Sequence, residues 1–381
     1  MSERYPQAPA VAATAPSFNI EPLRFEADFE QIPEDEGETI AALTDAMRQI
    51  TEKTSHDYGH AVRSVHAKSH GLLRGELRVL DNLPPALAQG VFAQAGTFPV
   101  VLRFSTNPGD ILSDRVSTPR GLAIKVIGVD GPRLPGAEGQ TTQDFVMQNA
   151  PAFTASTPKD FLKTLKLLAK TTDKAGQAKE ILSAVLRGTE AALEAVGAQS
   201  ATLKSMGGHP ETQVLGETFY TIVPFLYGPY IAKLSVAPVS PSLTALTDQK
   251  VDLKDRPDGL REEINAFFAN QGGEWEVRVQ LCTDLQKMPI EDAAVRWDED
   301  QSPFFPVARI TVAPQPAWTD ARSAAVDDGL AFSPWHGLAA HRPLGGIMRS
   351  RKPAYEMSAT YRGQFNGCPI HEPKALDKLP E

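Results

Sequence analysis

Two arginines and one tyrosine lie at helical spacing in the segment from 351 to 362. Arg351 precedes Tyr355 by four residues, and Arg362 follows Arg351 by eleven. With about 100° per residue on an α-helix, Tyr355 lies about 40° from Arg351, and Arg362 returns to within about 20° of it. A phenol is a poor metal ligand until it is ionised, and a nearby arginine favours the phenolate. The spacing therefore predicts a helical face that can present a hard oxygen ligand to ferric iron.

A second interpretation of this face needs no metal. The face could be a solvated basic surface, with Tyr355 packed against the body of the protein. Pro353 loosens the geometry, because a proline inside a helix removes a hydrogen bond and costs roughly 3 kcal/mol, so the helix could begin or kink there. The spacing alone does not decide between a basic surface and an iron site in which tyrosine ligates haem.

Four of the eight histidines fall within fifteen residues, at 56, 60, 66 and 70. Their spacing of four would place pairs of imidazoles on one helix face, as in some zinc sites. Gly59, Gly71 and the alternation around Val62 and Val65 argue against a helix, and no cysteine or HExxH glutamate completes a zinc site. Surface or capping roles suit His56, His60 and His70, whereas a structural and a catalytic role stay equally open for His66.

The elements that must position these groups alternate between helices and short strands. Apolar periodicity predicts helices over 35–54, 260–270 and 344–364, and two helices over 158–197. Alternating or β-rich runs predict strands over 75–80, 100–105, 121–129, 144–148, 218–235, 274–283 and 304–312. Mixed strands with inserted helices indicate an α+β fold, with the strands closed into an antiparallel β-barrel flanked by helices.

The bulk composition predicts an ordinary soluble enzyme. The net charge of -9 over 381 residues argues against nucleic-acid binding, and two cysteines exclude a disulfide framework. There is no apolar run of about 18 residues, so we expect no membrane insertion. Residues 1–24 are expected to form a flexible arm without the pattern of a signal peptide, and 25–381 a single domain in a cytoplasmic protein.

Six ordered segments resemble the haem catalase superfamily, most closely its short catalase-related peroxidase branch. They match the distal histidine segment, the strand with its supporting serine, two further strand segments, a Phe-Ser-Pro-Trp segment and the proximal Arg-x-x-x-Tyr pattern. They lie at 63–71, 102–106, 118–125, 144–153, 332–335 and 351–355, and Arg362 stands where the family has a propionate-binding arginine. Together these matches span about 300 residues.

The resemblance implies a haem b cofactor, with its iron bound to Tyr355, which Arg351 keeps ionised. His66 would act as the distal base, held by Ser105. The propionates would pair with Arg63, Arg103 and Arg362, and the haem would lie against Val65, Phe153 and Phe161.

The amide that orients peroxide is the main departure from the family pattern. The family has two consecutive asparagines, of which the first acts, and an ungapped alignment places this pair at Gln148 and Asn149. Asn149 is the preferred amide, provided that a bulge shifts the strand by one residue. Gln148 is the alternative.

The resemblance also implies a reaction class, a small-molecule peroxide as substrate and an oligomer, for which we expect a homodimer. The chain ends soon after the proximal helix, so we expect neither the C-terminal extension of full-length catalases nor NADPH. A less covered channel favours a peroxidase that reduces hydrogen peroxide or organic hydroperoxides with an organic donor. The alternatives are a true catalase, a fatty-acid hydroperoxide isomerase of the allene oxide synthase type, and a non-enzymatic haem-binding barrel. Val65 argues against the isomerase, because those enzymes have threonine at this position.

Overall fold

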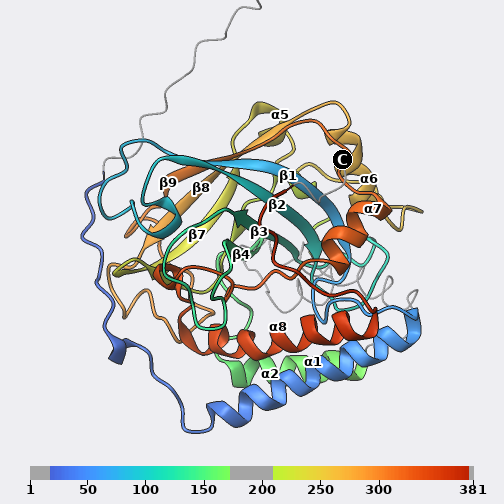
Figure 1. Cartoon of the computed structure of the whole chain (residues 1–381), viewed down its shortest axis with the longest axis horizontal. Helices are drawn as coiled ribbons and strands as arrows, with labels where there is room; N and C mark the ends of the chain where they lie inside the picture. The colour runs from blue at the N-terminus through green and yellow to red at the C-terminus, as the bar shows by residue number, and fades with distance from the viewer. Residues whose placement is uncertain (1–17, 172–208, 377–381) are drawn as a thin grey trace, which may run out of the picture.

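The computed structural model describes residues 18–171 and 209–376 and shows a closed antiparallel β-barrel with helices packed on its outside (Figure 1). Eight strands form the ring, because β5 pairs with both β4 and β7. In ring order they are β1 (Ser69–Val79), β2 (Gly96–Thr106), β3 (Arg120–Ile127), β4 (Thr142–Gln148), β5 (Phe219–Tyr220), β7 (Tyr230–Pro238), β8 (Gly273–Leu281) and β9 (Phe305–Val312). The short strand β6 (Phe225–Tyr227) pairs with β7 outside the ring. The predicted α+β barrel is confirmed.

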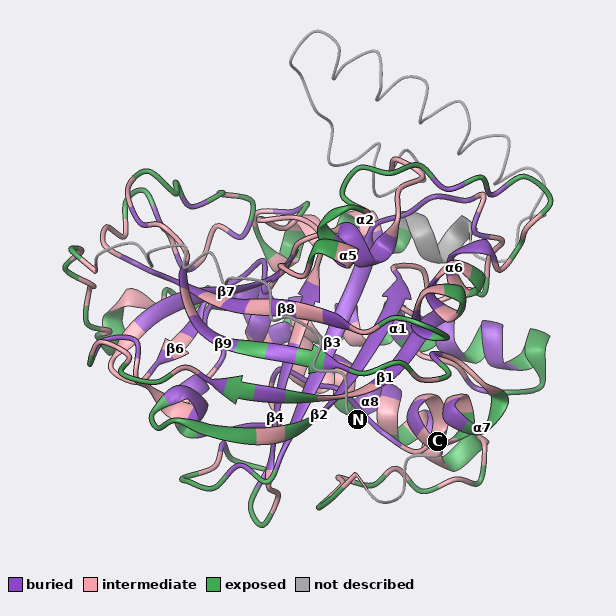
Figure 2. Cartoon of the chain, turned by 90° about the horizontal axis from the view of Figure 1, so that it is seen from above, coloured by how far each residue is buried: buried purple, intermediate pink, exposed green. Residues whose placement is uncertain are grey.

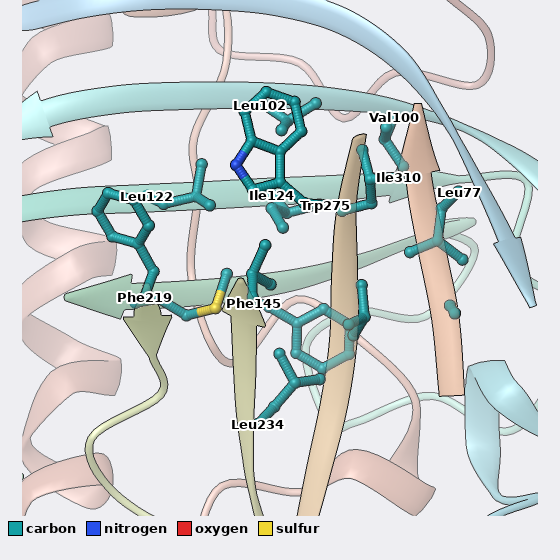
Figure 3. Packing of buried hydrophobic residues seen from close by; sticks show 14 of the residues in the cluster. Leu77, Val100, Leu102, Leu122, Ile124, Phe145, Phe219, Leu234, Trp275 and Ile310 are labelled. Carbon is teal, nitrogen blue, oxygen red and sulfur yellow. The ribbon is translucent and has the colours of Figure 1, made fainter. Parts of the chain in front are cut away.

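The barrel interior is the main hydrophobic core. Residues that alternate along the strands point inward, which is the period-two pattern of a strand with two different faces. Figure 3 shows such side chains from several strands meeting inside the barrel, among them Leu102, Leu122, Phe145 and Trp275. The residues between them on β2 and β3, such as Val101 and Ala123, point outward, where they form a separate apolar cluster with Val326 and Phe332.

Three helices cover one side of the barrel as a layer. These are α1 (Glu36–Tyr58), α2 (Pro158–Thr171) and α8 (Gly345–Phe365), which lie side by side below the barrel in Figure 1. Their facing apolar side chains form a second core that includes Leu43, Met47, Leu165 and Met357. Because this layer and the loops shield the outer face, all eight residues of β3 are buried, as Figure 2 shows.

The structure extends or divides several predicted elements. The predicted strand over 218–235 consists of β5, β6 and the first part of β7, because turns interrupt it at 221–224 and 228–229. The predicted helix over 35–54 continues to Tyr58, so His56 is helical after all. Pro353 lies inside α8, which begins at Gly345 rather than at the proline. The helix expected in the second half of 158–197 lies outside the described residues.

Part of the predicted N-terminal arm contacts the barrel. The Leu23 amide donates to the Cys282 carbonyl over 2.8 Å, and the Phe18 ring packs on Phe305 with 5.1 Å between centroids. Residues 1–17 lie outside the described part. Within residues 18–171 and 209–376, none of the helices combines the length and the apolar character needed to cross a bilayer.

Candidate active site

A cavity lies between the outer face of the barrel and the helical layer. Its walls come from β2, β3, β4, α1, α8 and the connections before β1 and α8. The lining residues are Met47, Arg63, Ser64, Val65, His66, Arg103, Ser105, Gly121, Leu122, Ala123, Val146, Met147, Ala331, Phe332, Ala354, Tyr355, Ser358, Ala359 and Arg362.

The strand register builds the wall on which the His66 ring rests. Ser105 pairs with Gly121, and Gly121 pairs with Gln148, so these residues form one row across β2, β3 and β4. His66 Nδ1 lies 3.2 Å from Ser105 Oγ, and His66 Nε2 lies 3.4 Å from Gln148 Nε2. If Nδ1 carries the proton and donates to Ser105, Nε2 keeps its lone pair. The ring then presents a base next to the amide of Gln148.

The backbone of His66 adopts a conformation that most residues avoid. Its φ is 54°, in the left-handed region, where a non-glycine residue costs on the order of 1–3 kcal/mol. Two backbone hydrogen bonds hold it, from His66 to the Asn107 carbonyl at 2.7 Å and from Ala67 to the Pro108 carbonyl at 2.9 Å. Because outliers of this kind cluster at functional sites, the fixed orientation of His66 indicates a functional role.

Gly121 leaves the space that the imidazole needs. A Cβ at this position would lie 2.6 Å from His66 Nδ1 and Cε1, and 3.1 Å from Ser105 Oγ. Glycine in a strand interior often marks a close approach of another group. Glycine at position 121, in the predicted strand over 121–129, is the signal in the sequence for this close approach.

We expect Gly121→Ala to displace the His66 ring and to lower the rate of peroxide consumption by roughly tenfold or more, since small misplacements of catalytic groups are costly. Stopped-flow measurement of that rate, together with a thermal melt, tests this expectation. The matched control is Gly96→Ala, at the start of β2, where an added Cβ would meet nothing nearer than 3.8 Å. An unchanged rate in Gly121→Ala would contradict the proposed contact between this position and the ring.

Burial and positive charge keep His66 neutral. Desolvation is the larger cause, and the nearby Arg103, Arg351 and Arg63 add to it, which together lower the pKa of His66 to about 3. An imidazole that is neutral at physiological pH can accept a proton, whereas an imidazolium cannot. The site therefore holds its histidine in the base form.

The structure places Gln148, and not Asn149, beside His66. The pairing of β3 with β4 continues without a bulge to Gly121 and Gln148, so the shift that would bring Asn149 into the cavity does not occur. Because successive side chains along a strand point to opposite faces, the Asn149 side chain points away from the row formed by Ser105, Gly121 and Gln148. Its Oδ1 accepts from the Arg120 amide at 2.9 Å, and its Nδ2 contacts Glu217 and lies 2.8 Å from His209 Nε2. The preference for Asn149 as the peroxide-orienting amide therefore loses its geometric basis.

Tyr355 and Arg351 meet on α8 as the helical spacing predicts. The Arg351 Nη2 donates to the Tyr355 hydroxyl oxygen over 2.6 Å, and Tyr355 lines the cavity. Arg362 lies about two turns further on and does not flank the phenol. It donates instead to the backbone carbonyls of Asp327 and Leu330. The expected face with one phenol and two flanking guanidinium groups is thus divided into two separate parts.

Arg63, Arg103 and Arg362 all line the cavity and converge on Asp327. Asp327 Oδ1 accepts from Arg103 Nε at 2.7 Å and from Arg63 Nη1 at 2.9 Å. The Nε of Arg362 is buried and finds no hydrogen-bond partner among the described residues. This cationic cluster suits an anionic ligand, because guanidinium groups pair well with carboxylates. Asp327 was missed in the sequence, and no motif or spacing marked it.

Two aromatic residues expected at the cofactor do not line the cavity. Phe153 and Phe161 pack on each other, with 5.0 Å between ring centroids, in the apolar clusters next to α8. Val65 does line it, as expected. The aromatic wall is instead supplied by Phe332.

The other three histidines of the 56–70 segment lie apart from the cavity. His56 is exposed on α1, and His60 pairs with Asp328 at 2.9 Å. His70, expected in a surface or capping role, is fully buried in β1, where its Nε2 lies 3.1 Å from Thr106 Oγ1. Within the described ranges, no group of three or more His, Cys, Asp or Glu side chains is arranged to hold a metal ion.

Comparison with solved structures identifies the fold. A fungal catalase matches with a TM-score of 0.59 at 18% identity, over 87% of this chain and 71% of that one. Catalase A from Saccharomyces cerevisiae matches with a TM-score of 0.59 at 17% identity, over 87% and 67%. A bacterial catalase matches with a TM-score of 0.56 at 18% identity, over 99% and 71%. No protein-family model and no curated protein sequence matches the chain. The chain therefore has the catalase fold.

Proposed function

We propose that this protein is a haem-dependent enzyme that cleaves the oxygen–oxygen bond of peroxides, and that it belongs to the short catalase-related peroxidase branch. The observation that carries the proposal is one cavity lined by both His66 and Tyr355, each with its own polar partner, Ser105 and Arg351 respectively. A general base and a potential iron ligand in one cavity are what peroxide cleavage at an iron centre needs.

The residues present fit a haem. Tyr355 would ligate the iron, while Arg63, Arg103 and Arg362 would bind the propionates, and the buried Nε of Arg362 is a donor ready for such a carboxylate. The remaining wall is largely apolar, as a porphyrin face requires. When bound, the haem would supply the redox chemistry that accepts one oxygen atom from the peroxide.

The protein's own groups would move the proton. His66 Nε2 takes a proton from one peroxide oxygen and returns it to the other, which leaves as water or as an alcohol. Ser105 fixes the ring orientation and the tautomer by accepting from Nδ1. The amide of Gln148, next to Nε2, donates to the peroxide and orients it.

The proposed reductant is an organic donor. Apolar residues such as Val65, Val146 and Met147 dominate the cavity wall, and they suit an organic hydroperoxide as well as hydrogen peroxide. A true catalase would instead use a second hydrogen peroxide and release oxygen. A hydroperoxide isomerase would consume a fatty-acid hydroperoxide without any donor.

The test starts from haem-loaded full-length protein. A high-spin ferric spectrum of the tyrosinate type supports the proposed haem site. If no Soret band appears after reconstitution with haem, the proposed haem site is wrong. The protein is then incubated with hydrogen peroxide, cumene hydroperoxide or a fatty-acid hydroperoxide, with and without a phenolic donor. Donor-dependent consumption supports the peroxidase. Vigorous oxygen release without donor oxidation identifies a catalase, and donor-independent rearrangement identifies an isomerase.

Paired substitutions distinguish the two candidate amides. We expect Gln148→Leu to lower the rate of peroxide cleavage about tenfold to a hundredfold, because one aligned donor is lost. We expect Asn149→Ala to lower the free energy of unfolding by about 1–3 kcal/mol, because it removes the hydrogen bonds to the Arg120 amide and to Glu217, with little change in rate. Stopped-flow kinetics and denaturant titration measure both. A larger rate loss in Asn149→Ala would reverse the assignment.

The pH profile offers a further prediction. Since the pKa of His66 is about 3, against an ordinary value of 6.5, the ring stays neutral as the pH falls from 8 to about 5. The rate of peroxide cleavage should therefore be flat across this range and should decline only in more acidic solution. Rapid pH-jump mixing measures the rate before the protein unfolds. An acid limb centred near pH 6.5 would show that His66 titrates normally.

A further inference from the structure

Asp327 occupies the centre of the arginine cluster without lining the cavity. Its carboxylate accepts four side-chain hydrogen bonds, which come from Arg63 and Arg103 at Oδ1 and from Ser69 at 2.7 Å and Ser323 at 2.9 Å at Oδ2. Its backbone carbonyl accepts from Arg63 and Arg362. One residue of the π-helical turn η4 (Ala324–Asp328) thus contacts all three arginines that face the cavity.

The cluster contains more positive than negative charge. Three guanidinium groups and one carboxylate leave a net charge of plus two. Burial lowers the pKa of Arg63 well below its ordinary value, and repulsion from Arg103 and Arg362 adds to this. Burial alone would raise the pKa of Asp327, but Arg103 and Arg63 outweigh it and lower that pKa. The groups are therefore strongly coupled, and the unsatisfied charge faces the cavity.

We propose that Asp327 is a positioning residue, an internal counter-ion that holds Arg63 and Arg103 in place and sets the charge of the arginine cluster at plus two. The inference rests on the proposed function, because this charge matches a porphyrin with two free carboxylates. Asp327 acts through the arginines, so its effect falls on the recognition of carboxylates and not on the reacting atoms. Three arginines without it would repel one another in a site of low dielectric.

Metal-free porphyrins test the role of Asp327 separately from catalysis. Protoporphyrin IX has two carboxylates, and its dimethyl ester has the same ring but no negative charge. Fluorescence titration of the full-length protein gives a Kd for each, and the ratio of the two values isolates the carboxylate contribution. Thermal melts of the ligand-free protein report how far Asp327 stabilises the arginines.

For Asp327→Asn we expect a lower melting temperature of the ligand-free protein. We also expect about a tenfold increase in the preference for the diacid over the diester, because the ligand then replaces the missing anion. The matched control is Asp320→Asn, since this aspartate is exposed in the short helix α7 (Asp320–Ser323), just before η4. We expect its preference to stay within about twofold of the wild type. A purely structural ion pair would lower the melting temperature and leave the preference unchanged, which would overturn the proposal.

The double variant Asp327→Asn with Arg103→Met covers the case in which the single variant does not fold. It removes one cation with the anion and keeps a charge of plus two, so we expect it to fold and to regain the wild-type preference within about twofold. Loss of either property would overturn the charge argument. If the wild type binds neither porphyrin, the proposed function fails. The counter-ion role is then decided by the ligand-free melts, in which the double variant must be more stable than Asp327→Asn.

Discussion

Tyr355→Phe is expected to lower the affinity for haem by at least about a hundredfold and to abolish the tyrosinate-type ferric spectrum. Phenylalanine keeps the aromatic ring, so we expect the fold to be preserved and only the oxygen ligand to be lost. The expected size follows from the position of the hydroxyl, which lines the cavity and accepts a hydrogen bond from Arg351 at 2.6 Å. Loss of the partners of a metal ligand alone typically costs 10- to 100-fold, and loss of the ligand itself costs more.

Haem titration monitored at the Soret band measures this effect. Arg351→Met should give an intermediate result, with affinity lowered about 10- to 100-fold, because the phenolate loses its cationic partner. Tyr361→Phe is the matched control, since it lies on the same helix, stacks on Phe365 and does not line the cavity. If Tyr355→Phe retained the wild-type spectrum and affinity, Tyr355 would not be the iron ligand.

His66→Asn is expected to lower the rate of peroxide cleavage by about 10²- to 10⁴-fold, the usual contribution of a general acid–base group. Asparagine is chosen because it tolerates the positive φ of 54° better than alanine does. It lacks the basic nitrogen that would accept the peroxide proton. Binding of haem should change only slightly, because His66 contributes to the peroxide side and not to the iron ligand.

Stopped-flow kinetics on haem-loaded protein measures this rate. His60→Asn provides the control, since His60 belongs to the same histidine-rich segment but pairs with Asp328 and Asn366. The control should keep the wild-type rate. Unchanged peroxide cleavage in His66→Asn would contradict the proton-transfer role and would favour a barrel that binds haem without turning peroxide over.

Local patterns in the sequence predicted the parts of the site that a single element builds. The spacing of Arg351 and Tyr355 sufficed for their contact, because residues four apart on a helix are neighbours whatever surrounds them. The alternation around Leu102 and Leu122 likewise sufficed to predict the strands and which of their side chains point inward, because side chains alternate across any strand. The same local logic misled the prediction for Arg362, since a shared helical face does not determine which loop packs against each turn.

The tertiary structure decided every relationship between distant segments. Which amide lies beside His66 depended on the register of β3 with β4, in which a shift of one residue reverses the face of each side chain. The space for the imidazole depended on Gly121 lying between Ser105 and Gln148 in one row. Asp327 reaches its three arginines only because the turn η4 packs against the segment before β1, against β2 and against the last turn of α8. By itself, the sequence determined the barrel, the helices and the Arg351–Tyr355 pair. The placement of Gln148 beside His66 and the charge of the arginine cluster were determined by packing between elements, which no local spacing encodes.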